Sequence, residues 1–408
     1  MKGERERQLA KFLIIHPYMD IYGGGEKVSH QIIKSLLEHG QTVQLLTFEF
    51  DRVKYEQTMG EKLPEEIVTS LGRSINVKPP FSVYKRRYTF IKRAKKIKHS
   101  EFDYVFSTQT MTAFESAFFS EKKPNLAYVH FPEIHDRNVN SGILHRFYMK
   151  PYMRWLNQDI SKLDIIFCNS NYTKARIEKY WSKDGIPEPI VAFPPVDLEL
   201  FWCKTPLVER TKRVIYVGRF IPQKRHELMK KLAAEIPKIQ FLSVGGLRET
   251  EEEWFKEFTK DSPTNYVAKP NLPSNELLKL YAESRVYCHL MEGEHFGITP
   301  IEALASGCVT LPHKSGGTGE FIPDEFRWQT YEDLKEKIIR WVEPSQADND
   351  TWDKKRDELW QKITVLQPKV FREKVWAHVQ WLMQQKDGSL QPEPEDADST
   401  AKKEQLKS

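Results

Sequence analysis

The chain has 408 residues, 39% hydrophobic and 29% charged, a balance typical of a soluble globular protein long enough for two domains of ordinary size. It contains no run of eighteen apolar residues, so we expect no transmembrane helix, and the first apolar run, at residues 12–15, is too short for a signal peptide, which favours a cytoplasmic protein. The net charge of +5 is too modest to argue for nucleic acid, and four cysteines without a Cys-x-x-Cys pair favour buried thiols over disulfides or zinc.

The first segment with a clear pattern, residues 12–47, is predicted to form a strand, a loop, a helix and a second strand. This order is a βαβ unit and implies a parallel sheet. The loop contains three consecutive glycines, among them Gly24 and Gly25, followed by Glu26. Backbone N–H groups in such a loop can close on an anion or on a sugar, although a flexible connector is an equally open explanation.

A basic stretch, residues 84–99, carries eight Lys or Arg with aromatic and aliphatic residues between them. The ordinary explanation is a solvated helix face. The first alternative is a basic amphipathic surface on anionic lipid headgroups, where each basic residue contributes roughly 1 kcal/mol, and nucleic acid is a second. A further amphipathic stretch, residues 143–156, fits either the entrance of a ligand site or internal packing, and we expect Pro151 to kink or interrupt it.

His130 closes a predicted buried strand at residues 126–130 and is followed by Phe-Pro. The carboxyl ends of strands in open α/β sheets meet at ligand-binding crevices. A single histidine at a strand end is more often structural, so position alone does not assign a role. Glu133 and His135 follow closely and are candidates for contact with a ligand at this crevice.

The second half of the chain, which begins after Pro194-Pro195, repeats the order of strand, loop and helix. A stiff Pro-Pro connector predicts a domain boundary near residues 198–212. The strand at residues 213–217 leads into a loop with Arg219 and Lys224. These residues are either ordinary surface charges or two cations directed at one loop.

Two glutamates flank a predicted helix start after the apolar strand at residues 286–290. Glu294 lies in the loop, Gly297 permits close approach of a ligand, and Glu302 lies about two turns into the helix. Free N–H groups at a helix start suit a phosphate, and carboxylates suit hydroxyl groups. A nucleotide sugar has both features, although glutamates in such positions are ordinarily a solvated loop residue and a helix-face residue.

The string from Glu294 to Glu302 resembles the Glu-x7-Glu signature of the retaining glycosyltransferases of family 4, which have the GT-B fold. The likeness continues through Ala-Ser-Gly-Cys at residues 305–308 and His-Lys-Ser-Gly-Gly at residues 313–317. Its form is most similar to the cytosolic α-1,2-mannosyltransferases that extend lipid-linked oligosaccharides.

The resemblance implies an α/β protein with two Rossmann-like domains facing across a cleft. Residues 1–200 would bind the acceptor and residues 201–370 the nucleotide sugar. The helix at about residues 371–386 would cross back to the first domain. Residues 387–408 lack apolar side chains and are expected to be disordered.

The resemblance also implies roles for individual residues. Arg219 and Lys224 would hold the donor diphosphate, Glu294 the sugar hydroxyls, Glu302 the ribose, and His130 would contact the transferred sugar. The predicted catalytic residues are His130, Arg219, Lys224 and Glu294. The predicted donor-binding residues are Gly24, Gly25, Arg219, Lys224, Phe296, Gly297, Ile298 and Glu302. The predicted acceptor-binding residues are Glu26, Glu133 and His135.

The predicted reaction is the transfer of a hexose, mannose from GDP-mannose by resemblance, to a hydroxyl of a glycan or lipid-linked glycan with retention of configuration. No Asp-x-Asp pair lies in a loop after a predicted strand, so we expect no metal, and no cofactor besides the nucleotide sugar. The resemblance adds peripheral attachment to the cytoplasmic face of a membrane through residues 84–99. The alternatives are a family 4 enzyme with a UDP-sugar, a glycan phosphorylase, for which we find no pyridoxal lysine, and a non-catalytic glycan- or nucleic-acid-binding protein.

Overall fold

The computed structural model describes residues 9–19, 23–75, 81–182 and 185–386, together with residues 392 and 394. The chain forms two compact units, one from Met1–Pro195 with Pro368–Ser408 and one from Val196–Gln367. The assignment of acceptor and donor to domains at residues 1–200 and 201–370 stays a prediction. The expected disorder of residues 387–408 lies outside the described residues, apart from 392 and 394.

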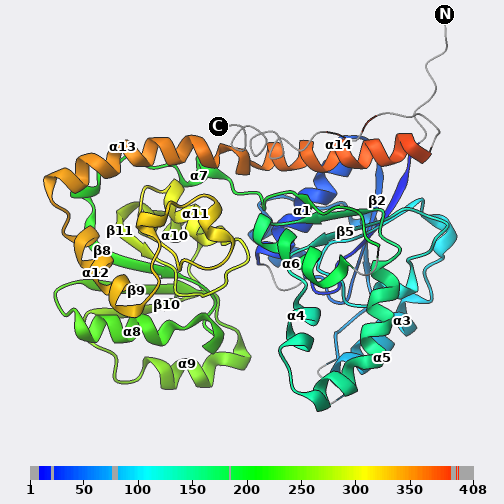
Figure 1. The fold of residues 1–408 in the computed structure, drawn as a ribbon, viewed down its shortest axis with the longest axis horizontal. Coiled ribbons are helices and arrows are strands. Elements are labelled where there is room, and N and C mark those ends of the chain that lie inside the picture. The colour runs from blue at the N-terminus through cyan, green and yellow to red at the C-terminus, as the bar shows by residue number, and fades with distance from the viewer. Residues whose placement is uncertain are drawn as a thin grey trace, which may run out of the picture. The chain divides into compact units, whose positions relative to one another are not determined.

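The N-terminal unit contains a parallel sheet of seven strands in the order β3-β2-β1-β4-β5-β6-β7 (Figure 1). The strands are β1 (Lys11–Ile15), β2 (Thr42–Thr47), β3 (Val68–Ser70), β4 (Tyr104–Ser107), β5 (Asn125–Val129), β6 (Ile165–Cys168) and β7 (Ile190–Val191). The order reverses between β1 and β4, so the loops at the carboxyl ends of these two strands diverge to opposite faces. Ligands bind at such a switch point in open α/β sheets.

Helices cover both faces of this sheet because successive strand residues point to opposite sides. Phe12 and Ile14 pack into a core with α1 and α14, whereas Leu13 and Ile15 pack into a core with α3, α5 and α6. The helices of this unit are α1 (Gly24–Glu38), α2 (Arg52–Met59), α3 (Ser82–Ala94), α4 (Glu133–Val139), α5 (Ile143–Ile160), α6 (Asn171–Trp181) and α14 (Pro368–Lys386).

The C-terminal helix α14 packs against α1 in the N-terminal unit (Figure 1). Phe371 and Val375 are buried in the core that α1 shares. The Arg372 guanidinium donates to Glu38 Oε2 at 2.8 Å and to Gln31 Oε1 at 2.7 Å, both on α1. The expectation that this helix returns to the first domain is confirmed.

The C-terminal unit contains a parallel sheet of five strands in the order β10-β9-β8-β11-β12. The strands are β8 (Thr211–Val217), β9 (Gln240–Gly245), β10 (Tyr266–Pro270), β11 (Ser284–Cys288) and β12 (Val309–Leu311). The helices are α7 (Leu198–Phe201), α8 (His226–Glu235), α9 (Glu252–Thr259), α10 (Ser274–Glu283), α11 (Ile298–Ala305), α12 (Tyr331–Val342) and α13 (Gln346–Ile363). This unit has its own switch point between β8 and β11, so the predicted pair of Rossmann-like sheets is confirmed.

Of the kink or interruption expected at Pro151, the interruption is wrong, because α5 runs without a break from Ile143 to Ile160, and a kink stays a prediction. Proline removes one N–H donor, which leaves the carbonyl of Phe147 without its helical partner. Phe147 and Pro151 both lie on an exposed side of α5, where water can serve that carbonyl. Tyr152 and Leu156 are buried on the other side and hold the helix in place.

No helix among the described residues has an apolar stretch long enough to cross a lipid bilayer.

Candidate active site

The loop between β11 and α11 holds Glu294 where two loops meet. Glu294 forms an isolated parallel bridge with Gly316, and the Gly317 N–H donates to the Glu294 carbonyl oxygen at 2.8 Å. Gly316 has a φ of 94°, and a Cβ there would lie 2.2 Å from that carbonyl oxygen. A side chain at residue 316 would therefore displace the loop, so this second glycine-rich loop positions the backbone of Glu294.

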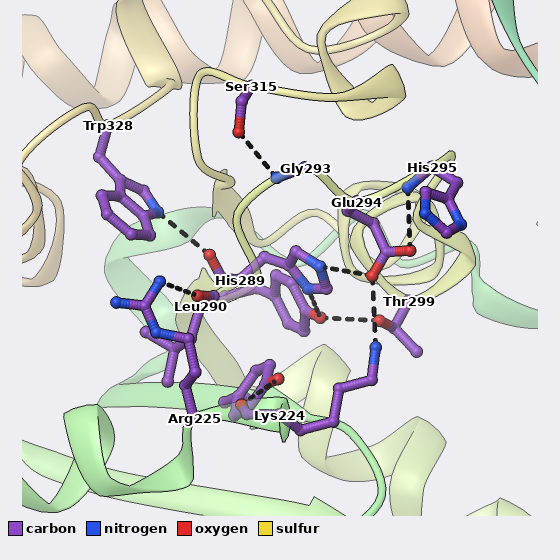
Figure 2. A network of polar contacts seen from close by, with 12 residues as sticks. Lys224, Arg225, His289, Leu290, Gly293, Glu294, His295, Thr299, Ser315 and Trp328 are labelled. Carbon is purple, nitrogen blue, oxygen red and sulfur yellow. Dashed lines mark hydrogen bonds and ion pairs between the residues drawn. The ribbon is translucent and has the colours of Figure 1, made fainter. Parts of the chain in front are cut away.

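Three donors converge on the carboxylate of Glu294 (Figure 2). Oε2 lies 3.1 Å from His289 Nε2 and 3.3 Å from Lys224 Nζ, and the backbone N–H of His295 donates to Oε1 at 3.2 Å. Burial acts to raise the pKa of Glu294, but the hydrogen bond from His289 and the positive charge of Lys224 outweigh it and lower the pKa well below its ordinary value. The carboxylate is therefore ionised at neutral pH, and its side chain remains 20% exposed to a ligand.

A relay of hydroxyl and imidazole groups connects Glu294 to the first turn of α11. Burial lowers the pKa of His289, so the ring is neutral near pH 7 and its Nε2–H donates to the carboxylate. Nδ1 then accepts from the Tyr287 hydroxyl at 3.0 Å, and the Tyr287 oxygen lies 2.8 Å from Thr299 Oγ1 (Figure 2). Our sequence analysis missed His289, although its place at the end of an apolar strand, five residues before Glu294, was a usable signal.

The N-terminus of α11 follows Gly297, whose φ is 89°. A Cβ at this residue would lie 2.6 Å from Thr318 Cγ2, so close packing of two loops and the backbone conformation both require glycine. The residue at the N-cap, Gly297, has no side chain to cap this helix end, and Pro300 lies in its first turn. The N–H groups of the first turn therefore remain suited to an anion. Phe296 is buried against Phe321, with ring centroids 5.9 Å apart, and fixes the loop just before this turn.

Glu302 lies in α11 with 5% of its surface exposed. The hydroxyl of Tyr281, from α10, donates to its Oε2 at 3.4 Å. Glu302 thus lies on the same helix as Thr299, and the hydrogen bonds through Tyr287 and His289 connect Thr299 to Glu294. Contact with a ribose stays a prediction, as does the donor-binding role of Ile298.

The loop after β8 brings Lys224 to Glu294 and leaves Arg219 exposed. The Tyr216 hydroxyl donates to the Lys224 carbonyl at 2.7 Å, and Nε2 of the buried His226 donates to the Arg219 carbonyl at 3.0 Å. Burial lowers the pKa of His226 to about 4, so this ring is a neutral support of the loop. Among the described residues, Arg219 has no ion-pair partner, and its guanidinium is available to an anion.

The first glycine-rich loop is closed by Glu26. The Gly23 N–H donates to Glu26 Oε2 at 2.6 Å, which is the N3 half of a capping box at the start of α1. Glu26 Oε1 lies 3.4 Å from His16 Nε2, at the end of β1. Burial acts to raise the pKa of Glu26, but these hydrogen bonds and the charge of His16 lower it overall.

Thr108, which follows β4, links this loop to His130. Its hydroxyl lies 3.0 Å from His16 Nδ1 and 2.8 Å from Ser29 Oγ, and its carbonyl oxygen lies 3.1 Å from His130 Nε2. A Cβ at Gly25 would lie 3.4 Å from His130 Nε2, so the start of α1 lies directly beside this histidine. The structure thus brings Gly25, Glu26 and His130 together at the switch point of the N-terminal sheet, beside Gly24 at the start of α1. Asp20, Ile21 and Tyr22 of the same loop lie outside the described residues.

The two remaining predicted acceptor residues differ in exposure. Glu133 begins α4, is exposed and pairs with Arg137. His135 is buried, its Nε2 bonded to Asn157 Oδ1 at 3.0 Å and its Nδ1 accepting from Trp181 Nε1 at 3.0 Å. Acceptor contact stays a prediction for both residues, and this geometry does not favour it for His135.

In the part of the chain that the structure describes, no group of three or more His, Cys, Asp or Glu residues is placed to hold a metal ion. The expectation of a metal-independent reaction stays a prediction.

Two family models match the chain, one to each unit. Residues 22–200 match the model described as Glycosyltransferase Family 4, and residues 203–358 match the model described as Glycosyl transferases group 1. The chain belongs to glycosyltransferase family 4. It is therefore a retaining hexosyltransferase of the GT-B class that uses a nucleotide-sugar donor.

Several curated family 4 relatives share the name GDP-Man:Man(3)GlcNAc(2)-PP-Dol alpha-1,2-mannosyltransferase. The protein from Xenopus laevis is 23% identical over 380 residues, which cover 77% of this chain and 74% of the relative. The human protein is 30% identical over 173 residues, which cover 38% of this chain and 35% of the relative.

Solved structures support the fold of this family 4 enzyme. Sucrose-phosphate synthase from Thermosynechococcus elongatus superposes with a TM-score of 0.70 at 18% identity and covers 93% of this chain and 100% of that chain. Anabaena HepE in complex with UDP and glucose superposes with a TM-score of 0.65 at 15% identity and covers 92% of this chain and 99% of that chain. At these identities the likeness establishes the GT-B fold alone.

Proposed function

We propose that this family 4 enzyme transfers mannose from GDP-mannose to a hydroxyl of a glycan or lipid-linked glycan. The observation that carries the proposal is the Glu294, His289 and Lys224 cluster beside the uncapped N-terminus of α11. An ionised carboxylate for sugar hydroxyls, next to a cation and helix N–H groups for a diphosphate, matches both parts of a nucleotide sugar.

The electrostatics of this cluster suit departure of a nucleoside diphosphate. The bond between the anomeric carbon and the diphosphate oxygen breaks as the acceptor oxygen bonds to that carbon on the same face. The acceptor proton passes to the leaving diphosphate. Lys224, Arg219 and the first turn of α11 would stabilise the negative charge that develops there, an effect of about 10²- to 10³-fold for one donor.

In the N-terminal unit, His130 would contact the transferred sugar, with Gly24 and Gly25 allowing close approach of the substrate. The hydrogen bond between His130 and the Thr108 carbonyl supports a defined ring orientation for this role. Glu133 is the proposed acceptor-contacting residue, and Glu26 is proposed to serve the acceptor side by holding the first glycine-rich loop beside His130.

The proposals of mannose and of a lipid-linked acceptor are based on the names of the relatives, because the site geometry fits any nucleoside diphosphate hexose. The second candidate donor is a UDP-sugar, supported by Anabaena HepE, whose structure contains UDP and glucose. A non-catalytic binding protein is less well supported, because Glu294 and Lys224 lie together and Arg219 has no carboxylate partner among the described residues.

The partner proposed for residues 84–99 is an anionic membrane, at the cytoplasmic face. Lys85, Lys92 and Lys95 form an exposed stripe on and just after α3. Two other cations of the stretch bind backbone carbonyls of their own unit, since Arg87 donates to the Ala113 carbonyl at 2.9 Å and Arg93 to the Leu71 carbonyl at 3.0 Å. The basic surface is thus smaller than the sequence indicates.

The test is a panel of nucleotide sugars, scored by thermal unfolding and by slow release of nucleoside diphosphate. A ligand at about a hundred times its dissociation constant stabilises the folded state by roughly 2.7 kcal/mol. We expect GDP-mannose to raise the unfolding temperature of the wild type and of Lys212→Met, an exposed lysine paired with Glu343 in the same unit, but not of Lys224→Met. A response to a UDP-sugar alone would reject mannose, and no response to any donor would favour the non-catalytic alternative.

A further inference from the structure

The first turn of α5 exposes large apolar side chains. Ile143 is 77% exposed, Leu144 87% and Phe147 78%, and His145 and Arg146 between them are exposed as well. We call residues 143–147 the docking turn. The rest of α5 is anchored, because Met149, Tyr152 and Leu156 are buried in the N-terminal core. The exposure therefore belongs to a rigidly held helix, and apolar side chains gathered in this way mark interaction surfaces.

The apolar side chains share one face of the helix and are bordered by cations. Residues one and four apart lie within one angular sector of an α-helix, which places Ile143, Leu144 and Phe147 together. Arg146, Lys150 and Arg154 are exposed along the same helix. Within the described part of the chain, no carboxylate pairs with any of these three cations.

The helix α3 extends the same surface. The Tyr84 hydroxyl, from α3, donates to the Tyr148 carbonyl at 2.6 Å, and the two rings pack with centroids 5.2 Å apart. Lys85 and Tyr88 are exposed on α3, with Tyr88 66% exposed. Figure 1 shows α3 and α5 beside each other at the margin of the N-terminal unit.

Neither α3 nor the part of α5 up to Gln158 contains an acidic residue. Residues 67–100 and residues 137–158 lack Asp and Glu entirely, although Asp and Glu number 57 in the whole chain. The charged side chains that α3 and the first turns of α5 expose are therefore basic, and the nearest acidic residues on the neighbouring α4 have partners, Glu133 with Arg137 and Asp136 with the Tyr180 hydroxyl. Such charge is complementary to an anionic partner and repels a basic one.

We propose that the docking turn inserts Ile143, Leu144 and Phe147 into the headgroup region of an anionic lipid bilayer, with Arg146, Lys150 and Arg154 on the lipid phosphates. An amphipathic helix with large apolar residues on one face and Lys or Arg beside them binds bilayers in this way. The projecting turn, exposed on all sides, suits insertion into a soft layer, and the basic α3 adds attraction over a wider area.

The placement fits the proposed reaction, and the inference rests on that proposed function for its biological purpose. The helix α4 starts at Glu133, three residues after His130. The chain then continues from the end of α4 directly into the docking turn. A lipid-linked acceptor held at the bilayer would thus meet the segment that follows the sugar-contacting histidine.

The test is flotation of the full chain with vesicles of phosphatidylcholine containing about one-third phosphatidylserine, beside vesicles of phosphatidylcholine alone. We expect binding to the anionic vesicles that weakens with salt. The variant Ile143→Ser/Leu144→Ser/Phe147→Ser should lose at least tenfold in binding, because it removes the inserted apolar area. The variant Arg146→Gln/Lys150→Gln/Arg154→Gln should lose roughly fivefold for each cation removed.

The matched control is Leu200→Ser/Val208→Ser/Val365→Ser, which changes apolar side chains that are 56%, 51% and 48% exposed in the C-terminal unit. It should bind vesicles like the wild type. Wild-type protein that stays with the buffer, or a serine variant of the docking turn that binds equally well, would overturn the proposal. Self-association abolished by that variant, without vesicle binding, would assign the surface to a protein contact and also overturn it.

Donor binding separates this inference from the proposed function. The docking-turn variants should keep the thermal shift with nucleotide sugar, because none of their residues belongs to the donor cluster. A wild type that binds vesicles but shows no shift with GDP-mannose would contradict the proposed donor alone. A wild type that shows the shift but ignores vesicles would contradict the docking turn alone.

Discussion

The two units each pair a buried histidine with a glutamate beside a glycine-rich loop, yet the two carboxylates are used differently. Glu26 lies 3.4 Å from His16 and Glu294 lies 3.1 Å from His289. The side chain of Glu26 is 7% exposed and binds the Gly23 N–H of its own loop. The side chain of Glu294 is 20% exposed and has Lys224 within 3.3 Å.

This difference separates a carboxylate that holds a loop from one that faces a ligand. Both oxygens of Glu26 have partners inside the N-terminal unit, so this carboxylate stabilises the start of α1. Glu294 combines partial exposure with a cation that a diphosphate can also reach. The two His–Glu pairs look alike in the sequence. Their roles can be told apart only when the exposure of each glutamate and its additional partner, Gly23 or Lys224, are known.

The largest expected effect is on Glu294. Glu294→Ala should lower kcat by about 10³-fold, because it removes the sugar-facing carboxylate and leaves Lys224 and His289 without their shared partner. Thermal unfolding should show that the fold remains. Glu292→Ala, which removes an exposed glutamate paired with Arg225 in the same loop, is the control and should leave turnover nearly unchanged. Unchanged turnover in Glu294→Ala would reject the assigned site.

The next effect concerns Lys224. Lys224→Met should lower kcat by about 10²-fold and move the acid limb of the pH profile to higher pH. The sign follows from the charge of Lys224, which lowers the pKa of Glu294; without it the carboxylate takes up a proton at a higher pH. Steady-state kcat/KM between pH 4 and pH 8 measures the shift. An acid limb that stays in place would show that Lys224 does not act on Glu294.

Glu26 tests the other side of the comparison. Glu26→Gln should lower the free energy of unfolding by about 1–2 kcal/mol at pH 7, with less than a tenfold change in kcat, because it removes the negative charge that accepts from the Gly23 N–H and lies beside His16. The pKa of Glu26 is lowered in the folded state, so its contribution is present at neutral pH and is lost as pH falls through that pKa. Denaturant unfolding at pH 7 and pH 3 measures both.

The opposite result would revise the comparison. If Glu26→Gln leaves stability unchanged and raises KM for the acceptor more than a hundredfold, Glu26 contacts the acceptor instead of holding its loop.

A smaller effect is expected at Glu115, a buried carboxylate that accepts from Ser107 at 2.8 Å and from the Thr112 N–H at 3.1 Å. Burial, aided by the charge of Asp159, raises its pKa to about 7. The free energy of unfolding therefore falls as pH rises from the ordinary carboxyl pKa toward 7, because ionisation of Glu115 costs more in the folded state. Above about pH 7 it falls no further from this cause. Glu115→Gln should raise the free energy of unfolding by about 1 kcal/mol at pH 8 and by nothing at pH 4. An equal change at both pH values would show that charge is not the cause.

Several features of the fold followed from local patterns in the sequence. The apolar run at residues 12–15 and the later runs of the same kind became parallel strands because short apolar segments between glycine-rich loops and helices are buried on both faces. Gly297 was expected to allow close approach of a ligand, which stays a prediction, whereas its φ of 89° and its packing against Thr318 show a structural need for glycine. The return of the last helix to the first domain followed from the family resemblance.

Other features could not be predicted, because they depend on contacts between distant residues. The sequence marked residues 84–99 as one basic run, whereas the fold directs Arg87 and Arg93 to backbone carbonyls of their own domain. It marked Ile143 as part of an amphipathic helix but gave no sign that the first turn would project from the core. It offered His135 as an acceptor residue, and packing placed this ring between Asn157 and Trp181.

The sequence by itself determined the two α/β units, their glycine-rich loops and the residue types available for sugar and phosphate, since these depend on short-range periodicity, backbone freedom and charge. The tertiary structure alone decided which of these residues meet. Lys224, His289 and Glu294 come together because parallel strands align their carboxyl ends, which brings the loops after β8 and β11 to one edge of a sheet. Exposure, burial and the pKa of each carboxylate follow from that alignment, so they become visible only once the chain is folded.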